Sequence, residues 1–381
     1  MLLENNAYPD DVRVRLEAEA LTAAGHRVTV LAPREPGQQR SETVDGVEVR
    51  RFWLPPDRAD ARGILAEYLV AHVQLLVRAL WRLARGADVV HLHNPPDTLF
   101  PAGLAARALG RRMVFDNHDL TPELFEDKFG GARVAAVLRL AQRISMRSAD
   151  LVVASNQSQA ELAAGLRRRG AAGVTVVRNG PRRADLAAAP EWRQGSLHDP
   201  VIGYLGQLAS QDGVLDLVDL LAALRGRHRL DARLSVIGDG PARPALERAL
   251  DDAGLAGFVT FHGSVPFESV PGLLAGADVC VDPAPCNELN HRSTMTKIAE
   301  YLAAGRPVAA FRLAETERTA GDAALLARCG DRERLATNVQ RLCADGEERR
   351  RLGERAVARR EELVWEHSAR SLTEAYAALY R

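Results

Sequence analysis

The feature that most constrains the fold is an alternation between short hydrophobic runs of strand length and longer amphipathic stretches of helix length. In residues 1–180 the hydrophobic runs are HRVTVLAP, DVVHLHN, RMVFDNHD, LVVASN and VTVVRNG. Between residues 201 and 311 they are VIGYLG, RLSVIGDG, VTFHG, VCVDPAP and RPVAAF. Continuous Val- and Ile-rich runs separated by helices are typical of parallel strands buried on both faces. The two series predict two α/β domains, each built on a doubly wound, Rossmann-like sheet.

The length of the chain agrees with two domains, because 381 residues are too many for one ordinary core. The stretch 181–200 is rich in Pro, Ala and Arg and has no clear period, so it is predicted to be the linker. We therefore expect an N-terminal domain over residues 1–180 and a C-terminal domain over residues 201–365.

The composition is that of a soluble globular protein, with 46% hydrophobic and 26% charged residues. The formal net charge is zero, which gives no indication of nucleic-acid binding. No signal peptide is recognised, and the apolar stretch 64–84 contains too many polar residues to span a bilayer. None of the four cysteines forms a CxxC pair, so buried thiols in a reducing cytoplasm are expected. These cysteines are Cys280, Cys286, Cys329 and Cys343.

Several predicted strands end in a polar residue or a glycine. They end at His93-Asn94, His118-Asp119, Asn179-Gly180, Gly206 and Gly238-Asp239-Gly240. Ligands of open parallel sheets bind beyond the carboxyl ends of the strands, so two domains that turn these ends toward each other would enclose a central cleft. The alternative is that these residues simply make turns.

The segment HRSTMTKIAEYLAAGRPV, residues 291–308, predicts a phosphate site at a helix start. Neither a GxGxxG after a strand nor a GxxxxGK[ST] is present, so dinucleotide and P-loop sites are not indicated. Ser293 and Thr294 are good N-cap residues, and the free N–H groups of a helix start suit a diphosphate. Glu300 would lie two turns along, where its carboxylate can accept two hydrogen bonds from a ribose diol. The alternative is an exposed helix with an ordinary Lys297–Glu300 pair.

These motifs resemble, over nearly the whole chain, those of the retaining glycosyltransferases of family 4, which have the GT-B fold. YPDDVRVRLEAEALTAAGHRVTVLAP resembles the first helix and second strand of that family. The further motifs DVVHLHNPPD, VFDNHDL, VVRNG, VIGDGP, VTFHGSVP and STMTKIAEYLAAGRPV follow in the order of the family. WEHSARSLTEAYAAL resembles its terminal helix, which implies that residues 366–381 join the first domain.

The resemblance implies a nucleotide-sugar donor in the C-terminal domain and an acceptor in the N-terminal domain. Glu300 matches the second glutamate of the paired-glutamate motif, which binds the ribose, and the backbone of Gly263–Val265 would contact the base. His118 matches the family histidine near the donor sugar; the alternative is a turn histidine without a catalytic role. The candidate catalytic residues are thus His118, Lys297 and Glu300. The expected donor-binding residues are Gly206, Gln207, Gly238, Gly240, Gly263, Ser264, Val265, Arg292, Ser293, Thr294, Met295, Lys297 and Glu300.

The sequence departs from the family pattern where the diphosphate would bind. Arg292 stands in place of the first glutamate, and Gln207 and Asp212 stand where an arginine and a lysine are usual. Only MLLE precedes NNAYPDD, so the first strand is short and the usual Gly-rich loop is absent. Lys297 is one of two lysines among 50 basic residues. We hypothesise that the cationic role has moved to the helix, with Lys297 on the phosphates and Arg292 nearby.

On the acceptor side, the expected residues are Asn94, Asp97, Asp119 and Lys128. Lys128 lies in TPELFEDKFGG, which is predicted to be a mobile acceptor loop. Arg139, Arg143 and Arg147 recur every fourth residue and predict a basic stripe on a helix. This stripe would contact an anionic membrane surface, at about 1 kcal/mol per basic residue, or else be the solvated face of a core helix.

Together these features predict a metal-independent, retaining glycosyltransferase. The donor would be an NDP-sugar, with UDP as the default, and the acceptor a lipid-linked sugar or a growing surface polysaccharide. No metal or cofactor is expected, because the sequence has no DxD and no dense carboxylate cluster. The expected location is the cytoplasm, peripherally on the inner face of the membrane. The alternatives are a nucleotide-sugar epimerase of GT-B fold and a non-catalytic partner subunit.

Overall fold

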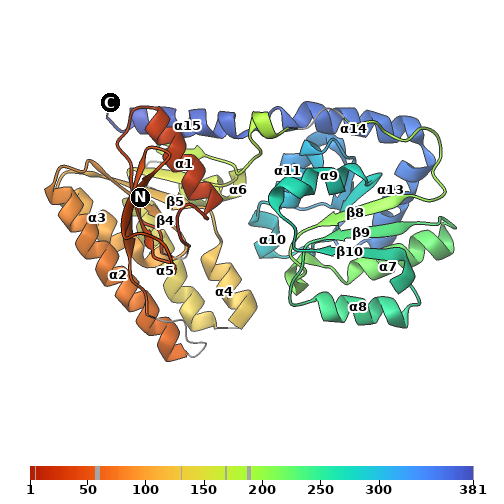
Figure 1. Cartoon of the computed structure of the whole chain (residues 1–381), viewed down its shortest axis with the longest axis horizontal. Helices are drawn as coiled ribbons and strands as arrows, with labels where there is room; N and C mark the ends of the chain where they lie inside the picture. Colours follow the sequence, from red (N-terminus) through yellow and green to blue (C-terminus); the bar gives the residue numbers. More distant parts are fainter. Residues whose placement is uncertain (5, 56–60, 130, 168–169, 187–189, 381) are drawn as a thin grey trace. The chain divides into compact units, whose positions relative to one another are not determined.

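The chain forms two compact units (Figure 1). In this computed structural model the described residues are 1–4, 6–55, 61–129, 131–167, 170–186 and 190–380, without the side chains of 61–65 and 127–129. Unit 1 comprises Met1–Asn179 and Glu366–Arg381, and unit 2 comprises Gly180–Trp365. Each unit contains its own sheet, parallel in unit 2 and mainly parallel in unit 1, which confirms the predicted pair of Rossmann-like domains.

The sheet of unit 2 has six parallel strands in the order β10-β9-β8-β11-β12-β13. Counted from β8, this is the Rossmann order 3-2-1-4-5-6. The strands are β8 (Val201–Leu205), β9 (Arg233–Ile237), β10 (Val259–Gly263), β11 (Val279–Asp282), β12 (Val308–Phe311) and β13 (Ala324–Ala327).

Hydrophobic residues at successive positions of one strand belong to two different core clusters of unit 2. Val279 and Val281 of β11 belong to one cluster, and Cys280 between them belongs to the other. Because side chains alternate across a strand, the two clusters lie on opposite faces of the sheet. The continuous hydrophobic runs of the sequence therefore have the expected cause, burial on both faces.

The helices of unit 2 connect these strands. They are α7 (Asp216–Ala222), continued by a π turn at Ala223–Arg227, α8 (Arg243–Asp252), α9 (Val270–Ala275), α10 (Glu288–Arg292), α11 (Thr296–Ala303), α12 (Ala314–Ala320), α13 (Arg332–Ala344) and α14 (Gly346–Arg360). Short 3-10 turns lie at Arg183–Asp185, Ser210–Asp212, Ala256–Phe258, Phe267–Ser269 and Gly321–Ala323. Residues 190–200 also pack on this unit, because Trp192 Nε1 donates to Gly305 O (3.0 Å) and Leu197 is buried.

Unit 1 has the same central strand order, with the antiparallel strand β2 added at one edge and β7 at the other. A very short first strand joins the sheet across its middle. Leu2 forms parallel bridges to Leu31 of β1 and to Leu92 of β4. These bridges connect the group β1-β3-β2 to the group β4-β5-β6-β7. The strands are β1 (Thr29–Pro33), β2 (Ser41–Val44), β3 (Val47–Phe52), β4 (Val89–His93), β5 (Arg112–Asn117), β6 (Leu151–Ala154) and β7 (Val174–Val176).

The helices of unit 1 are α1 (Val12–Ala23), α2 (Ala61–Ala84), α3 (Phe100–Ala108), α4 (Thr121–Phe129), α5 (Ala132–Ser148), α6 (Gln157–Leu166) and α15 (Trp365–Ala378), with a 3-10 turn at Asp97–Leu99. The prediction of a mobile loop at TPELFEDKFGG was wrong, since Thr121–Phe129 is the helix α4. Pro122 stands in its first turn, where proline favours a helix start, and the polar residues that suggested a loop are compatible with a surface helix.

The expectation of four buried thiols was also wrong. Cys286 and Cys329 form a disulfide, while Cys280 and Cys343 are buried thiols. The spacing of 43 residues gives no local signal, because the pair is brought together by the order of β11 and β13 in the sheet. Among the described residues, no helix is long and apolar enough to cross a membrane.

Candidate active site

β8 and β11 are neighbours in the sheet of unit 2, but the strands that follow them, β9 and β12, lie on opposite sides of this pair. The crevice beyond the carboxyl ends of β8 and β11 is therefore the expected ligand site of this sheet. Gly206 follows β8, and Pro283 follows β11. Of the predicted donor-binding residues, Gly206, Gly238 and Gly263 lie at or just beyond the ends of β8, β9 and β10, and Lys297 packs beside Gly206.

Four predicted donor-site glycines line the end of this sheet. Gly206, Gly238 and Gly263 follow or end three neighbouring strands, and Gly238 N donates to Gly263 O (2.9 Å). Gly238 has φ +124°, and a Cβ there would lie 2.0 Å from Gly206 O. A Cβ on Gly240 would lie 2.5 Å from Leu208 O. Only glycine permits these backbone segments to pack so closely, and the result is an edge made of main chain.

The side chains beside this edge are sparse. Gln207 and Ser264 are exposed, and Val265 is half-buried against a core cluster. The residues expected to contact the base and the diphosphate are therefore accessible in unit 2.

Lys297 is buried directly behind the Gly206 segment. Its Nζ donates to Asp212 Oδ1 (2.8 Å) and to the Tyr204 hydroxyl (3.2 Å), and lies 3.5 Å from Asp282 Oδ1. Burial alone would lower the pKa of Lys297, but Asp282, Tyr204 and Asp212 outweigh it and raise the pKa. The ammonium is thus charged and pairs with Asp212, the residue whose charge it was expected to offset. Contact between Lys297 and phosphate stays a prediction.

The start of α11 differs from the expected one. The helix begins at Thr296, with Met295 as an N-cap that makes no side-chain capping bond. Ser293 instead ends the short helix α10, where its Oγ donates to Leu289 O (2.8 Å), so the N-cap prediction for Ser293 and Thr294 was wrong. The reason is that an additional helical turn, Glu288–Arg292, precedes the segment and uses Ser293 at its own end.

Tyr301 fixes α11 against the strand ends. Its hydroxyl accepts a hydrogen bond from Leu205 N (2.9 Å) and donates to Val281 O (3.0 Å). One residue therefore joins the helix to both β8 and β11. Glu300, its neighbour in sequence, is held in place by this anchor.

Glu300 is a largely buried carboxyl group for which no hydrogen bond or ion pair is found among the described residues. Burial raises its pKa to about 7. An unpaired carboxyl in this position can accept hydrogen bonds from a ligand, which would repay its desolvation. Arg292, by contrast, is half-buried and pairs with Glu288 at 3.1 Å on α10.

Unit 1 presents a second unpaired carboxyl at the corresponding place in its sheet. Glu4 follows the short strand at Leu2, next to the carboxyl end of β4. It is 4% exposed and has no partner among the described residues. Burial, with the charge of Glu67 added, raises its pKa to about 7. The sequence analysis missed Glu4; the signal was its position directly after the abbreviated first strand.

The predicted acceptor residues Asn94, Asp97 and Asp119 do come together, around Asn94. Its Oδ1 accepts from His118 N (2.8 Å) and Asp119 N (3.1 Å). Its Nδ2 donates to Asp97 Oδ1 (3.1 Å) and Asp119 O (2.8 Å). Asn94 and Asp97 are fully buried, so they shape the loop that carries His118. Burial raises the pKa of Asp97 to about 7.

His118 is held by Asp116, a buried residue that the sequence analysis did not single out. His118 Nδ1 lies 3.1 Å from Asp116 Oδ2, and His93 Nδ1 lies 3.0 Å from the same oxygen. Arg13 binds both oxygens of Asp116 at 2.8 Å. Although burial opposes it, Asp116 raises the pKa of His118. An Nδ1–H donated to the carboxylate leaves Nε2 of His118 for a substrate.

Two groups of side chains in the described part of the chain have the spacing of metal ligands. One comprises Glu17, His91, His93 and Asp116 in the core of unit 1. Arg13 already places its guanidinium there, bonded to Asp116 and 3.2 Å from Glu17, so this group has its own cation. The other comprises Cys286, His291 and Cys329 in unit 2.

The remaining acceptor-side predictions concern α4 and α5. Lys128 falls within α4, and its side chain lies outside the described residues. Arg139 forms ion pairs with Glu126 and, at 3.9 Å, with Glu123 of α4. Arg143 and Arg147 are exposed, and Arg147 Nε donates to Leu166 O (3.0 Å). The three arginines of the predicted basic stripe therefore lie on α5, but the charge of Arg139 is neutralised by the glutamates of α4.

Family models match both halves of the chain. The model described as "Glycosyl transferase 4-like domain" matches residues 11–180, and the model "Glycosyl transferases group 1" matches residues 199–345. The chain thus belongs to the GT-B glycosyltransferases of the family 4 and group 1 type, and it is a glycosyltransferase.

Two curated relatives match nearly end to end. The 2-deoxystreptamine glucosyltransferase of Streptomyces kanamyceticus is 30% identical over 358 residues, which are 88% of this chain and 89% of the relative. The 2-deoxystreptamine N-acetyl-D-glucosaminyltransferase of Streptomyces fradiae is 29% identical over 371 residues, covering 90% and 84%.

Solved structures confirm the GT-B fold. Sucrose-phosphate synthase from Thermosynechococcus elongatus has a TM-score of 0.75 at 21% identity, covering 100% of this chain and 98% of that one. The Anabaena protein HepE in complex with UDP and glucose has a TM-score of 0.69 at 18% identity, covering 99% and 98%.

Proposed function

We propose that this glycosyltransferase uses a UDP-sugar donor, retains the anomeric configuration and glycosylates a hydroxyl of a small, amino-bearing cyclitol or sugar. The observation that carries the donor assignment is the unpaired carboxyl of Glu300, on the helix that Tyr301 joins to β8 and β11. There it would bind the ribose hydroxyls, with the glycine edge of unit 2 against the phosphates and the base. The choice of uridine is supported by HepE, a protein of similar fold whose structure was solved in complex with UDP.

The acceptor class rests on two independent supports. Two relatives of nearly full length are named as glycosyltransferases of 2-deoxystreptamine, a small diamine. In addition, Glu4 provides a buried, unpaired carboxyl at the switch point of the unit 1 sheet. A cationic amino group is the partner that best compensates such a carboxylate, because it supplies both charge and hydrogen bonds.

In this proposal no divalent metal assists the leaving group. The uncapped start of α11 offers its backbone N–H groups to the diphosphate, and Lys297 offsets the charge of Asp212. His118, oriented by Asp116, would hydrogen-bond the donor sugar through Nε2. A retaining reaction does not require His118 to act as a strong base.

The test combines a donor panel with an acceptor panel. UDP-, GDP- and TDP-sugars are incubated with 2-deoxystreptamine or with a polyprenyl-linked sugar, with and without a chelator. We expect UDP release and a new glycoside of 2-deoxystreptamine, unaffected by chelation, whose anomeric configuration by NMR is that of the donor. An interconverted nucleotide sugar would instead indicate an epimerase. Absence of turnover with every pair would indicate a non-catalytic subunit.

A lipid-linked or polysaccharide acceptor is the second candidate, and one feature of α5 favours it. Val134, Val137 and Leu140 are exposed on this helix, which also carries the exposed Arg143 and Arg147. Apolar and basic side chains on one surface helix suit the interface of an anionic bilayer. Transfer to the polyprenyl-linked sugar alone would support this candidate and contradict the aminocyclitol.

A further inference from the structure

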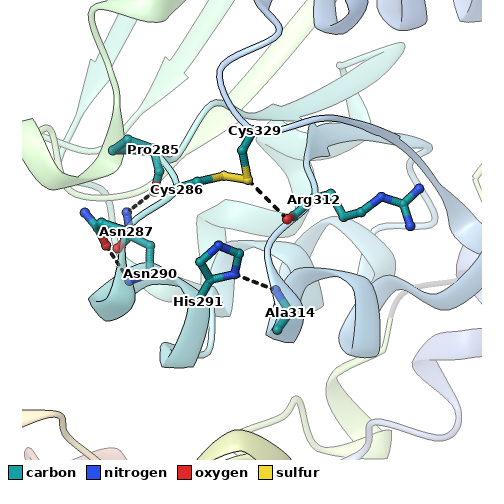
Figure 2. The surroundings of a disulfide bond; sticks show 8 residues. All are labelled: Pro285, Cys286, Asn287, Asn290, His291, Arg312, Ala314 and Cys329. Carbon is teal, nitrogen blue, oxygen red and sulfur yellow. Dashed lines mark hydrogen bonds between the residues drawn. A yellow bond between two sulfur atoms is a disulfide. The ribbon is translucent and has the colours of Figure 1, made fainter.

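The disulfide of unit 2 joins the loops that follow β11 and β13, the two strands on either side of β12 (Figure 2). Cys286 lies in the loop after β11, and Cys329 lies two residues beyond the end of β13. Cys329 is exposed and Cys286 is half-buried, so a small thiol reagent can reach the bond. The disulfide closes a segment of 43 residues within unit 2.

His291 brings a third ligand atom to this pair. It stands on α10, four residues after Asn287, whose side chain caps that helix by accepting from Asn290 N. The cap therefore fixes the helix on which the imidazole is carried. A ring nitrogen of His291 and the two sulfurs lie within 4.8 Å of one another. Nδ1 accepts a long hydrogen bond from Ala314 N (3.4 Å), and Figure 2 shows the other ring nitrogen on the side of the sulfurs.

We propose that Cys286, His291 and Cys329 form a binding site for zinc when the disulfide is reduced. Reduction by a dithiol converts the disulfide into two thiols and the dithiol into its own disulfide. The two thiols then lose their protons to solvent and coordinate the metal as thiolates together with neutral imidazole. Cys and His are the ligands zinc prefers, and a water can complete the tetrahedron.

The spacing of the three ligands is compatible with one ion. Zinc–sulfur bonds of about 2.3 Å in a tetrahedron place two sulfurs roughly 3.8 Å apart. The three ligand atoms already lie within 4.8 Å of one another, and the sulfurs, released from their bond, need only separate within their two loops. Backbone rearrangement of the sheet is not needed.

The two other cysteines are unsuited to this role and serve as matched controls. Burial raises the pKa of the thiols of Cys280 and Cys343 to about 12, so neither is a thiolate at neutral pH. Both are far more enclosed than Cys286 and Cys329. Metal binding through thiolates would therefore report on the disulfide pair alone.

Zinc would close the same bridge that the disulfide closes. Asn290 Nδ2 donates to Pro285 O (2.8 Å) and to Gln211 O (2.9 Å), which ties the Cys286 loop to the segment after Gly206. In the reduced protein this region has lost a covalent crosslink, and a bound ion would replace it. We therefore expect zinc to raise the Tm of the reduced protein and to leave that of the oxidised protein unchanged.

The test uses the full chain, reduced with a dithiol, freed of reductant under anaerobic conditions and titrated with Co²⁺ and then Zn²⁺. We expect one equivalent of Co²⁺ with a thiolate charge-transfer band, displaced by Zn²⁺. The oxidised chain, identical in sequence, should show no band. Failure of the reduced chain to give the band, or an equal band in both states, would overturn the proposal.

Variants then assign the ligands. Cys286→Ser and Cys329→Ser should each abolish the band, and His291→Gln should weaken Co²⁺ affinity at least tenfold. Cys280→Ser should bind as the parent chain does. Should a cysteine variant fail to fold, as judged by circular dichroism, His291→Gln and the comparison of oxidation states still decide. Unchanged affinity in a folded His291→Gln chain would rule out the three-ligand site.

Discussion

The two sheets have the same central strand order, yet their switch points are built from different material. In unit 2 the edge is main chain, because Gly206, Gly238 and Gly240 allow backbone to pack on backbone. In unit 1 the edge is made of side chains, with Asn94 and Asp116 each holding several partners. A backbone surface accommodates phosphates and a base in a general manner, whereas a side-chain network fixes particular atoms. Under the proposed function, this difference would divide nucleotide binding in unit 2 from acceptor selection in unit 1.

Each edge also contains a carboxyl group without a partner among the described residues, the largely buried Glu300 in unit 2 and the buried Glu4 in unit 1. Burial raises the pKa of both to about 7. Such groups cost stability when ionised, and a ligand can recover that cost by supplying hydrogen bonds. The predictions below test whether the two carboxyls serve different ligands.

Replacing Glu300 should have the largest effect. Glu300→Ala removes two charge-assisted hydrogen bonds to ribose, which together contribute about 3 kcal/mol or more, over a hundredfold in UDP affinity. Calorimetry with UDP measures the loss, and Glu347→Ala, at an exposed glutamate of α14, is the control. Unchanged UDP affinity in a folded Glu300→Ala chain would remove Glu300 from the donor site.

Glu4→Gln should increase the stability of the fold at alkaline pH and weaken binding of the acceptor. With a folded pKa of about 7 and an unfolded value of 4.5, the folded chain binds more protons between these values. Stability is therefore lost as pH rises from 4.5 to 7, by at most about 3 kcal/mol. Denaturant unfolding at pH 8 should show a gain of that order for Glu4→Gln, and at pH 4 no difference.

The same variant tests whether Glu4 affects the acceptor and leaves the donor nucleotide unaffected. Glu4→Gln should raise KM for 2-deoxystreptamine about tenfold and leave UDP affinity unaltered. Glu67→Gln is the matched control, because the charge of Glu67 is only the second cause of the raised pKa of Glu4. A loss of UDP affinity in Glu4→Gln would mean that the carboxyl is not on the acceptor side.

His118→Ala should reduce turnover far more than nucleotide affinity. In the proposed function this side chain orients the donor sugar, and misplacement of a reacting group costs on the order of a hundredfold in rate. Asp116→Asn should give part of this effect and shift the pH–rate profile to lower pH, since Asp116 raises the pKa of His118. If kcat and UDP affinity fall by the same factor, His118 binds the nucleotide instead.

Much of this comparison was accessible from the sequence. The hydrophobic runs predicted both sheets, and the glycines and polar residues at strand ends predicted a ligand site beyond the carboxyl ends of the strands, because such features depend on neighbours in sequence. The disulfide, the partners of Lys297 and the network around Asp116 were not predictable, since each depends on how strands distant in sequence are ordered in the sheet. Glu4 was missed for a related reason. Its strand is reduced to Leu2, which forms two bridges, and has no hydrophobic period to recognise.

Lys297→Met should have an intermediate effect on ligand binding. We expect tenfold weaker binding of UDP, about 1.4 kcal/mol, and unchanged binding of uridine. The variant leaves Asp212 and Asp282 without their cation, so reduced stability should accompany it. Lys297→Arg should restore UDP affinity incompletely, because a guanidinium is larger than the ammonium that fits between these groups. If Lys297→Met binds UDP as tightly as the parent chain, backbone N–H groups alone hold the diphosphate.

The smallest effect is expected on α5, where unit 1 would meet a membrane. Each exposed arginine near an anionic surface contributes about 1 kcal/mol to binding, and less at physiological salt. Because Glu123 and Glu126 already neutralise Arg139, charge reversal of Arg143 and Arg147 should remove most of the affinity for anionic vesicles, and Arg139→Glu should add little. Sedimentation with anionic vesicles at low salt measures binding, and turnover of 2-deoxystreptamine should stay constant. Equal vesicle binding by the parent chain and by a variant with Arg139, Arg143 and Arg147 all reversed would show that the basic stripe of unit 1 is an ordinary solvated helix face. It would leave the aminocyclitol as the acceptor class that the edge of unit 1 favours.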